Sequence, residues 1–207
     1  MSESDKILKF NFILNVIFTV SLAPVWYFFF SGIGSSNAFA DPRWLILFTS
    51  YVHIIPSIIS NACHYTAYKK NTKFIFGGMG IHLLFLSSIA FMILISSHPD
   101  GGAPRNLESI NYQIMLIMVA TTQVVIPFTL LLFAEGPKKA GRLMARAVIC
   151  AAILVVGTVL ALLLFNSNIF DNTLIVGRRG AIPMGKLFSL GVFFLSVITV
   201  GIIWEKD

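Results

Sequence analysis

The sequence predicts an all-α, polytopic integral membrane protein built as a bundle of six transmembrane helices. Six long apolar runs fill most of the 207 residues, and about 20 apolar residues span the ~30 Å hydrocarbon core as a helix. Charged residues make up only 12% of the chain, whereas a soluble domain carries roughly 25%. The net charge of +6 fits contact with anionic lipid headgroups.

The breaks between the apolar runs predict the helix boundaries. Asp41-Pro42 precedes the second run, residues 98–104 separate the third from the fourth, and Glu135-Gly136-Pro137 ends the fourth. All three are turn-forming clusters. We expect one transmembrane domain over residues 1–207, with helices at residues 8–31, 44–68, 74–96, 112–134, 144–165 and 187–204.

The basic residues predict the orientation of these helices. One side of the membrane receives Lys6, Lys9, Lys69, Lys70, Lys73, Lys138, Lys139, Arg142, Arg146 and Lys206. The other side receives Arg43, Arg105, Arg178, Arg179 and Lys186. Because Lys and Arg are enriched in cytoplasmic loops, we expect the first side, and with it both termini, to be cytoplasmic.

The residues inside the predicted spans limit the function classes. Asp and Glu lie in loops or at helix ends, whereas ion pumps place carboxylates within the bilayer. A carboxylate-driven proton or sodium antiporter is therefore not expected. The sequence also lacks a nucleotide-binding Gly-rich loop, a His-Glu-x-x-His motif and a Gly-x-Ser-x-Gly motif. We expect no enzyme, no metal site and no nucleic-acid partner.

The second predicted helix carries a stripe of polar residues. Pro56 lies within this helix and removes one of its backbone hydrogen bonds. The stripe is unfavourable against lipid, so it should face the bundle interior or a water-filled path. Its members recur at spacings that share one helical face: Ser50, His53, Ser57, Ser60 and His64.

Three other predicted helices carry polar groups that could line the same interior. They include Asn11 and Asn15 in the first helix, His82 in the third and Gln123 in the fourth. Interhelical hydrogen bonding, worth ~0.6 kcal/mol per contact, is the alternative reading of these groups. Our candidates for a solute or proton pathway are Asn15, His53, Ser57, His64, His82 and Gln123.

These features predict a small non-enzymatic membrane protein that passes a small solute or ion, or serves as an embedded subunit of a larger complex. A b-type haem electron-transfer subunit is the alternative. Two axial haem ligands on facing helices must lie at similar depths in the membrane. His82 lies between the depths of His53 and His64 and matches neither, whereas Met118 lies near the depth of His53. A membrane scaffold, in which the stripe only joins helices, is a further alternative.

The last outer loop combines the apolar segment 174–176 with Arg178 and Arg179. Such a patch could lie along the membrane surface or dock onto a partner, and the two arginines could hold an anionic group. The expected partners are membrane lipids, with other membrane subunits or a second copy of the chain. The compact build fits a bacterial inner membrane.

Overall fold

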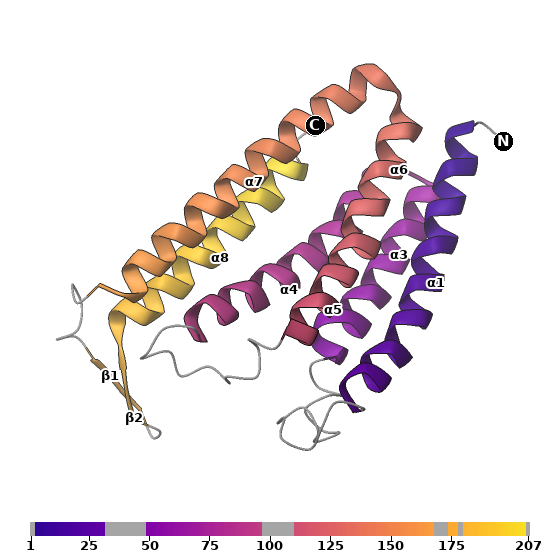
Figure 1. Cartoon of the computed structure of the whole chain (residues 1–207). Coiled ribbons are helices and arrows are strands. Elements are labelled where there is room, and N and C mark those ends of the chain that lie inside the picture. Colours follow the sequence, from indigo (N-terminus) through magenta and orange to yellow (C-terminus); the bar gives the residue numbers. More distant parts are fainter. Residues whose placement is uncertain (1–2, 32–48, 97–109, 168–173, 178–179, 206–207) are drawn as a thin grey trace. The chain divides into compact units, whose positions relative to one another are not determined.

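The structure is a computed structural model that describes residues 3–31, 49–96, 110–167, 174–177 and 180–205. These residues are helical apart from one β-hairpin (Figure 1). The elements are α1 (Glu3–Ser31), η2 (Ser50–Ile54), α3 (Ile55–Lys69), α4 (Phe74–Ser96), α5 (Ile110–Ala120), η4 (Thr121–Val125), α6 (Ile126–Glu135), α7 (Pro137–Phe165), β1 (Leu174–Gly177), β2 (Gly180–Pro183) and α8 (Met184–Glu205). The segments η2 and η4 are π-helical and continue directly into α3 and α6.

Five stretches among the described residues are long and apolar enough to cross a membrane, so the chain is an integral membrane protein. They are Glu3–Trp26, Phe74–Phe91, Gln113–Glu135, Lys139–Phe165 and Met184–Trp204. The prediction of membrane-spanning helices is therefore confirmed for five of the six. The other predicted span, described from Thr49 as η2 and α3, is not among them. Its polar stripe interrupts the apolar sequence, as the residues His53, Ser57, Ser60 and His64 show.

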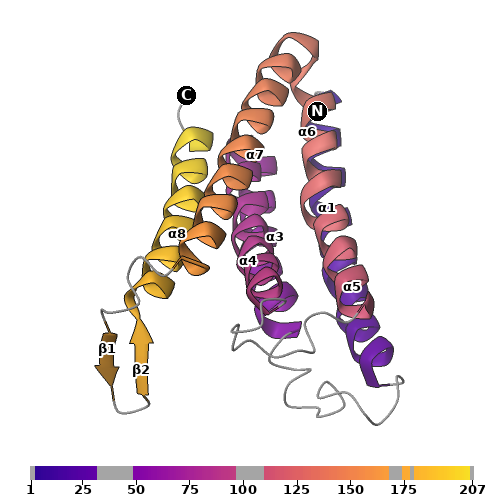
Figure 2. The same cartoon turned by 60° about the vertical axis from the view of Figure 1, so that its left-hand side comes forward.

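The chain divides into two compact units, Met1–Ala140 and Gly141–Asp207, which we describe separately. In the N-terminal unit four long helices form a ring. Helix α1 packs against α3 and α6, and α4 packs against α3 and the continuous helix α5–η4–α6. Figure 2 shows α3 beside α4 and α1 beside α6. Because α1 and α4 each contact both η2 and η4, the two π-helical segments face the same interior.

Four helices begin earlier than the sequence predicted: α1, α5, α7 and α8, with α7 showing the largest difference. Helix α7 starts at Pro137, not at residue 144, and only Gly136 separates it from α6. Gly136 has a φ of 79°, in the left-handed region that favours glycine, and proline suits the first turn of a helix. The basic residues after Pro137 are good helix formers. They form the first turns of α7 and not a loop.

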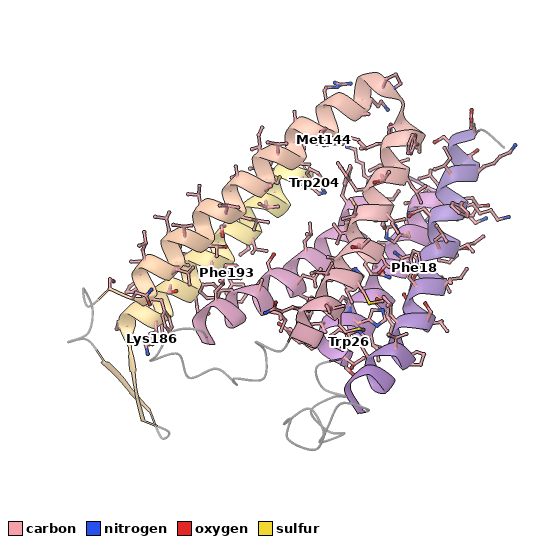
Figure 3. The ribbon with its side chains drawn as sticks, viewed as in Figure 1. Phe18, Trp26, Met144, Lys186, Phe193 and Trp204 are labelled. Carbon is pink, nitrogen blue, oxygen red and sulfur yellow. The ribbon has the colours of Figure 1, made fainter. Side chains whose placement is uncertain are left out.

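In the C-terminal unit α7 and α8 run side by side in opposite directions (Figure 1). Small residues let the two backbones approach. Ser189 donates a 2.6 Å hydrogen bond to the carbonyl of Ala161, and Gly157 faces Ser196. At the start of α8, where Figure 3 labels it, Lys186 places its ammonium group 5.0 Å from the centre of the Phe165 ring.

Between α7 and α8 the strands β1 and β2 pair antiparallel, with Leu174 opposite Pro183 and Gly177 opposite Gly180. The sequence pattern did not predict this hairpin. Its first strand contains Ile175 and Val176, which favour extended structure. Arg178 and Arg179, the candidates for an anionic group or partner, lie outside the described residues.

Candidate intramembrane site

The interior of the N-terminal unit is polar, and all four helices contribute to it. The six candidate residues predicted from the sequence are all buried, with exposed fractions of 0–1%. Helix α1 provides Asn15, the η2–α3 helix provides His53, Ser57 and His64, α4 provides His82, and η4 provides Gln123. The polar stripe therefore faces the bundle interior, as the sequence predicted.

Two of these side chains come from π-helical segments that are built in the same way. In each, the residue before a proline donates its backbone N–H five residues back: Ile55 to Ser50, and Ile126 to Thr121. An α-helix would connect residues four apart, so the hydrogen-bond ladder slips by one residue just before Pro56 and Pro127. Single-turn π-bulges are frequent at functional sites. Here they present His53 and Gln123 to the interior.

His82 has a hydrogen-bond partner for both ring nitrogens. Nδ1 lies 3.3 Å from the carbonyl of Gly78, and a carbonyl only accepts, so Nδ1 carries the hydrogen. In the neutral ring Nε2 then accepts from the hydroxyl of Ser57, at 3.1 Å. This pair joins α4 to α3 and fixes the orientation of the imidazole.

Among the described residues, His64 has a partner for one ring nitrogen only. Nδ2 of Asn11 donates to Nδ1 of His64 at 3.1 Å, so Nε2 carries the hydrogen in the neutral ring. Nε2 points toward Gly78, where an added methyl group would lie 3.0 Å from it and 3.0 Å from Oγ of Ser60. The absence of a side chain at Gly78 is what allows the imidazole to lie against α4.

Five buried side chains make no hydrogen bond through any polar atom within the described part of the chain: Asn15, His53 and Gln123, and the hydroxyl residues Thr49 and Ser60. In the same part of the protein, Oδ1 of Asn11 and Nε2 of His64 also lack a partner. More than about 90% of buried polar groups in proteins are hydrogen-bonded, and each exception costs roughly 1–3 kcal/mol. Such a cluster needs an explanation other than helix packing.

Two of the unpartnered side chains lie near the middle of their helices. Asn15 and Gln123 are each about 18 Å along their helices from the end that carries the charged residues, at ~1.5 Å rise per residue. Ser57 lies at the same height on α3. The helix ends on that side are held together, because the side chain of Thr72, in the turn before α4, hydrogen-bonds to Glu135 at the end of α6. Glu135 also pairs with Lys139 at 2.8 Å.

Apolar side chains are buried along the helices on both sides of the polar groups. Between the charged helix ends and the polar groups each helix of the ring buries at least one apolar side chain, and we take one from each: Leu8, Ala67, Ile75 and Leu131. We call this set the inner layer. Beyond the polar groups lies an outer layer of further buried apolar side chains, including the Trp26 labelled in Figure 3: Leu22, Trp26, Val52, Met115 and Val119.

The described residues give little basis for a metal or haem site. Among them, no three His, Cys, Asp or Glu side chains gather as metal ligands would. Both ring nitrogens of His82 are engaged. Met118, considered as a haem ligand opposite His53, is 37% exposed, which removes it as an interior ligand.

The sequence did not predict the roles of two residues of this site, Asn11 and Gly78. Asn11 was noted only as a polar group of the first helix, yet it orients His64. Gly78 lies in a Gly-Gly-x-Gly segment, which signals close helix packing without showing what approaches it. Comparison with known proteins found no matching family model, no similar curated protein and no similar solved structure.

Proposed function

We propose that the N-terminal unit carries a small polar molecule across the membrane, and that this molecule binds between Asn15, His53 and Gln123. The observation that supports the proposal best is that three helices each bury a side chain whose polar atoms have no partner in the described protein. We further propose that both termini are cytoplasmic, from the distribution of Lys and Arg, and that the membrane is a bacterial inner membrane.

The scaffold alternative explains the side chains that hydrogen-bond between helices, but it does not explain the unpartnered ones. Side chains that only join helices should bond to one another, as Nδ2 of Asn61 does to Thr19 at 2.9 Å and Ser57 does to His82. Asn15, His53 and Gln123 make no such bond within the described residues. Within a bilayer there is no bulk water to satisfy them, so a bound polar molecule is the simplest compensation.

The two apolar layers indicate how such a molecule would move. With both layers closed, the site is sealed from either side, so transport requires one layer at a time to part. We therefore propose saturable, transporter-like flux and not an open channel. Binding sites near the middle of the membrane, on helices interrupted by proline, are a recurring design of transporters.

The test is solute flux in liposomes that contain the purified full-length protein. Stopped-flow light scattering would follow volume changes after an imposed gradient of urea, acetamide or formate, and after an osmotic shock for water. We expect faster flux than in empty liposomes for at least one probe, and a lower affinity for that probe in Gln123→Leu. Thr121→Val is the matched control, because Thr121 lies on the same segment but is exposed. Wild-type flux equal to that of empty liposomes for every probe would refute the proposal.

A further inference from the structure

We propose that the transported molecule is uncharged and carries a hydrogen-bond donor beside an acceptor, as amides and urea do. This inference rests on the proposed function and specifies its substrate class. The reason begins with the chemistry of the free groups. Asn15 and Gln123 are carboxamides with the oxygen and the nitrogen both unpartnered in the described protein, and His53 has both ring nitrogens unpartnered. Each carboxamide therefore offers an NH2 group that donates and a carbonyl oxygen that accepts, and the neutral imidazole offers one donor and one acceptor.

The charge distribution disfavours an ion at this site. Among the described residues of the N-terminal unit, the Asp, Glu, Lys and Arg residues all lie near one end: Glu3, Asp5, Lys6, Lys9, Lys69, Lys70, Lys73, Glu135, Lys138 and Lys139. The stretches that carry His82 and Gln123 contain no charge at the height of the site. A buried ion without a counter-charge is strongly unfavourable, whereas a neutral ligand avoids that cost.

The apolar layers strengthen this inference. Since Ile75 and Leu131 of the inner layer and Val52 and Met115 of the outer layer are almost fully buried, a molecule between the layers cannot keep a shell of water. Every polar atom of the ligand must then find its partner on the protein. A small amide matches a site of paired donors and acceptors, because two carboxamides can exchange two hydrogen bonds at once.

An anion that enters together with a proton is the main competitor. His53 has two free ring nitrogens and could take the proton, which would create a cation to pair with the anion. This alternative predicts that formate flux acidifies or alkalinises the vesicle lumen, whereas amide flux does not. The two substrate classes are therefore separable in one preparation.

The experiment compares four probes in liposomes that contain the full-length protein: urea, acetamide, formate and methylammonium. We expect urea and acetamide to enter faster than into empty liposomes, with saturation, and formate and methylammonium to enter no faster. Gln123→Leu should lower the affinity for the amides about tenfold, the change that corresponds to ~1.4 kcal/mol of lost hydrogen bonding. Thr121→Val should leave it unchanged.

The outcomes distinguish this inference from the function on which it rests. Protein-dependent formate flux with a pH change reported by luminal pyranine, and no amide flux, would overturn the amide class but retain a transporter. Protein-dependent water flux alone would do the same. No protein-dependent flux of any probe would overturn both.

Discussion

The hydroxyl of Ser57 lies 3.1 Å from Nε2 of His82, and this contact separates two buried histidines by role. His82 is fully hydrogen-bonded, through Ser57 and Gly78, and it ties α4 to α3. His53 is equally buried but has no partner among the described residues. We therefore assign His82 to the structure of the site and His53 to its ligand, and substitutions at the two positions should have opposite effects on stability.

Ser57→Ala should destabilise the protein, because it removes the hydroxyl that donates a hydrogen bond to Nε2 of His82. In membrane proteins such a bond contributes ~0.6 kcal/mol on average and up to ~1.7 kcal/mol. Thermal unfolding in detergent would measure the loss. Thr66→Ala is the control, because Thr66 bonds only to the backbone of its own helix. An unchanged unfolding temperature for Ser57→Ala would contradict the assignment of His82 to the structure.

His53→Leu should leave the protein as stable as wild type or more stable. The substitution removes an unpartnered buried group, whose burial costs roughly 1–3 kcal/mol. It puts an apolar side chain of similar size in its place. Solute flux should be lost at the same time. Ile55→Leu, at an exposed position on the same helix, is the control for both measurements. A His53→Leu protein that unfolds at lower temperature yet transports normally would favour the scaffold alternative.

Gly78→Ala should disturb the site, because the new methyl group would lie 3.0 Å from both His64 and Ser60. Overfilling a packed interior costs about 1–3 kcal/mol, so the unfolding temperature should fall. Gly80→Ala is a close control two residues away. A methyl group there meets nothing within 4 Å, and alanine favours a helix over glycine by roughly 0.5–1 kcal/mol. Equal effects of the two substitutions would show that α3 and α4 are not packed as described.

Gly157→Ala should destabilise the C-terminal unit, because the added methyl group would collide with the side chain of Ser196. Ser196→Gly should restore stability in the double variant by removing the side chain that is struck. Gly191→Ala serves as the control, since a methyl group there meets nothing within 4 Å. Thermal unfolding of the single and double variants would give the coupling free energy between the two substitutions. Additive effects on stability would contradict the Gly157–Ser196 contact.

The sequence predicted where the helices lie better than how they fit together. The third predicted helix, 74–96, has the same bounds as α4, because long apolar runs specify spanning helices. The spacing of His53, Ser57 and His64 likewise predicted a buried face. Which histidine is hydrogen-bonded could not be predicted, since that depends on the register between α3 and α4.

The local backbone was predicted only in part. Pro56 signalled an interruption, but a proline does not reveal whether the helix kinks or forms a π-bulge. At Pro137 the basic residues were taken for a loop, although Lys and Arg near a membrane surface continue a helix readily. The hairpin of β1 and β2 was missed because its strands have only four residues each, too short for a periodic pattern.

The polar face of α3 also has a consequence for how the chain is made. A segment with His53 and His64 on one side partitions into lipid less readily than its neighbours, since polar residues raise the free energy of insertion from the translocon. The neighbours of His64, Asn11 and Gly78 among them, lie on α1 and α4. Newly made α3 should therefore stay in the translocon until α4 has emerged from the ribosome. The two helices should then enter the bilayer as a pair.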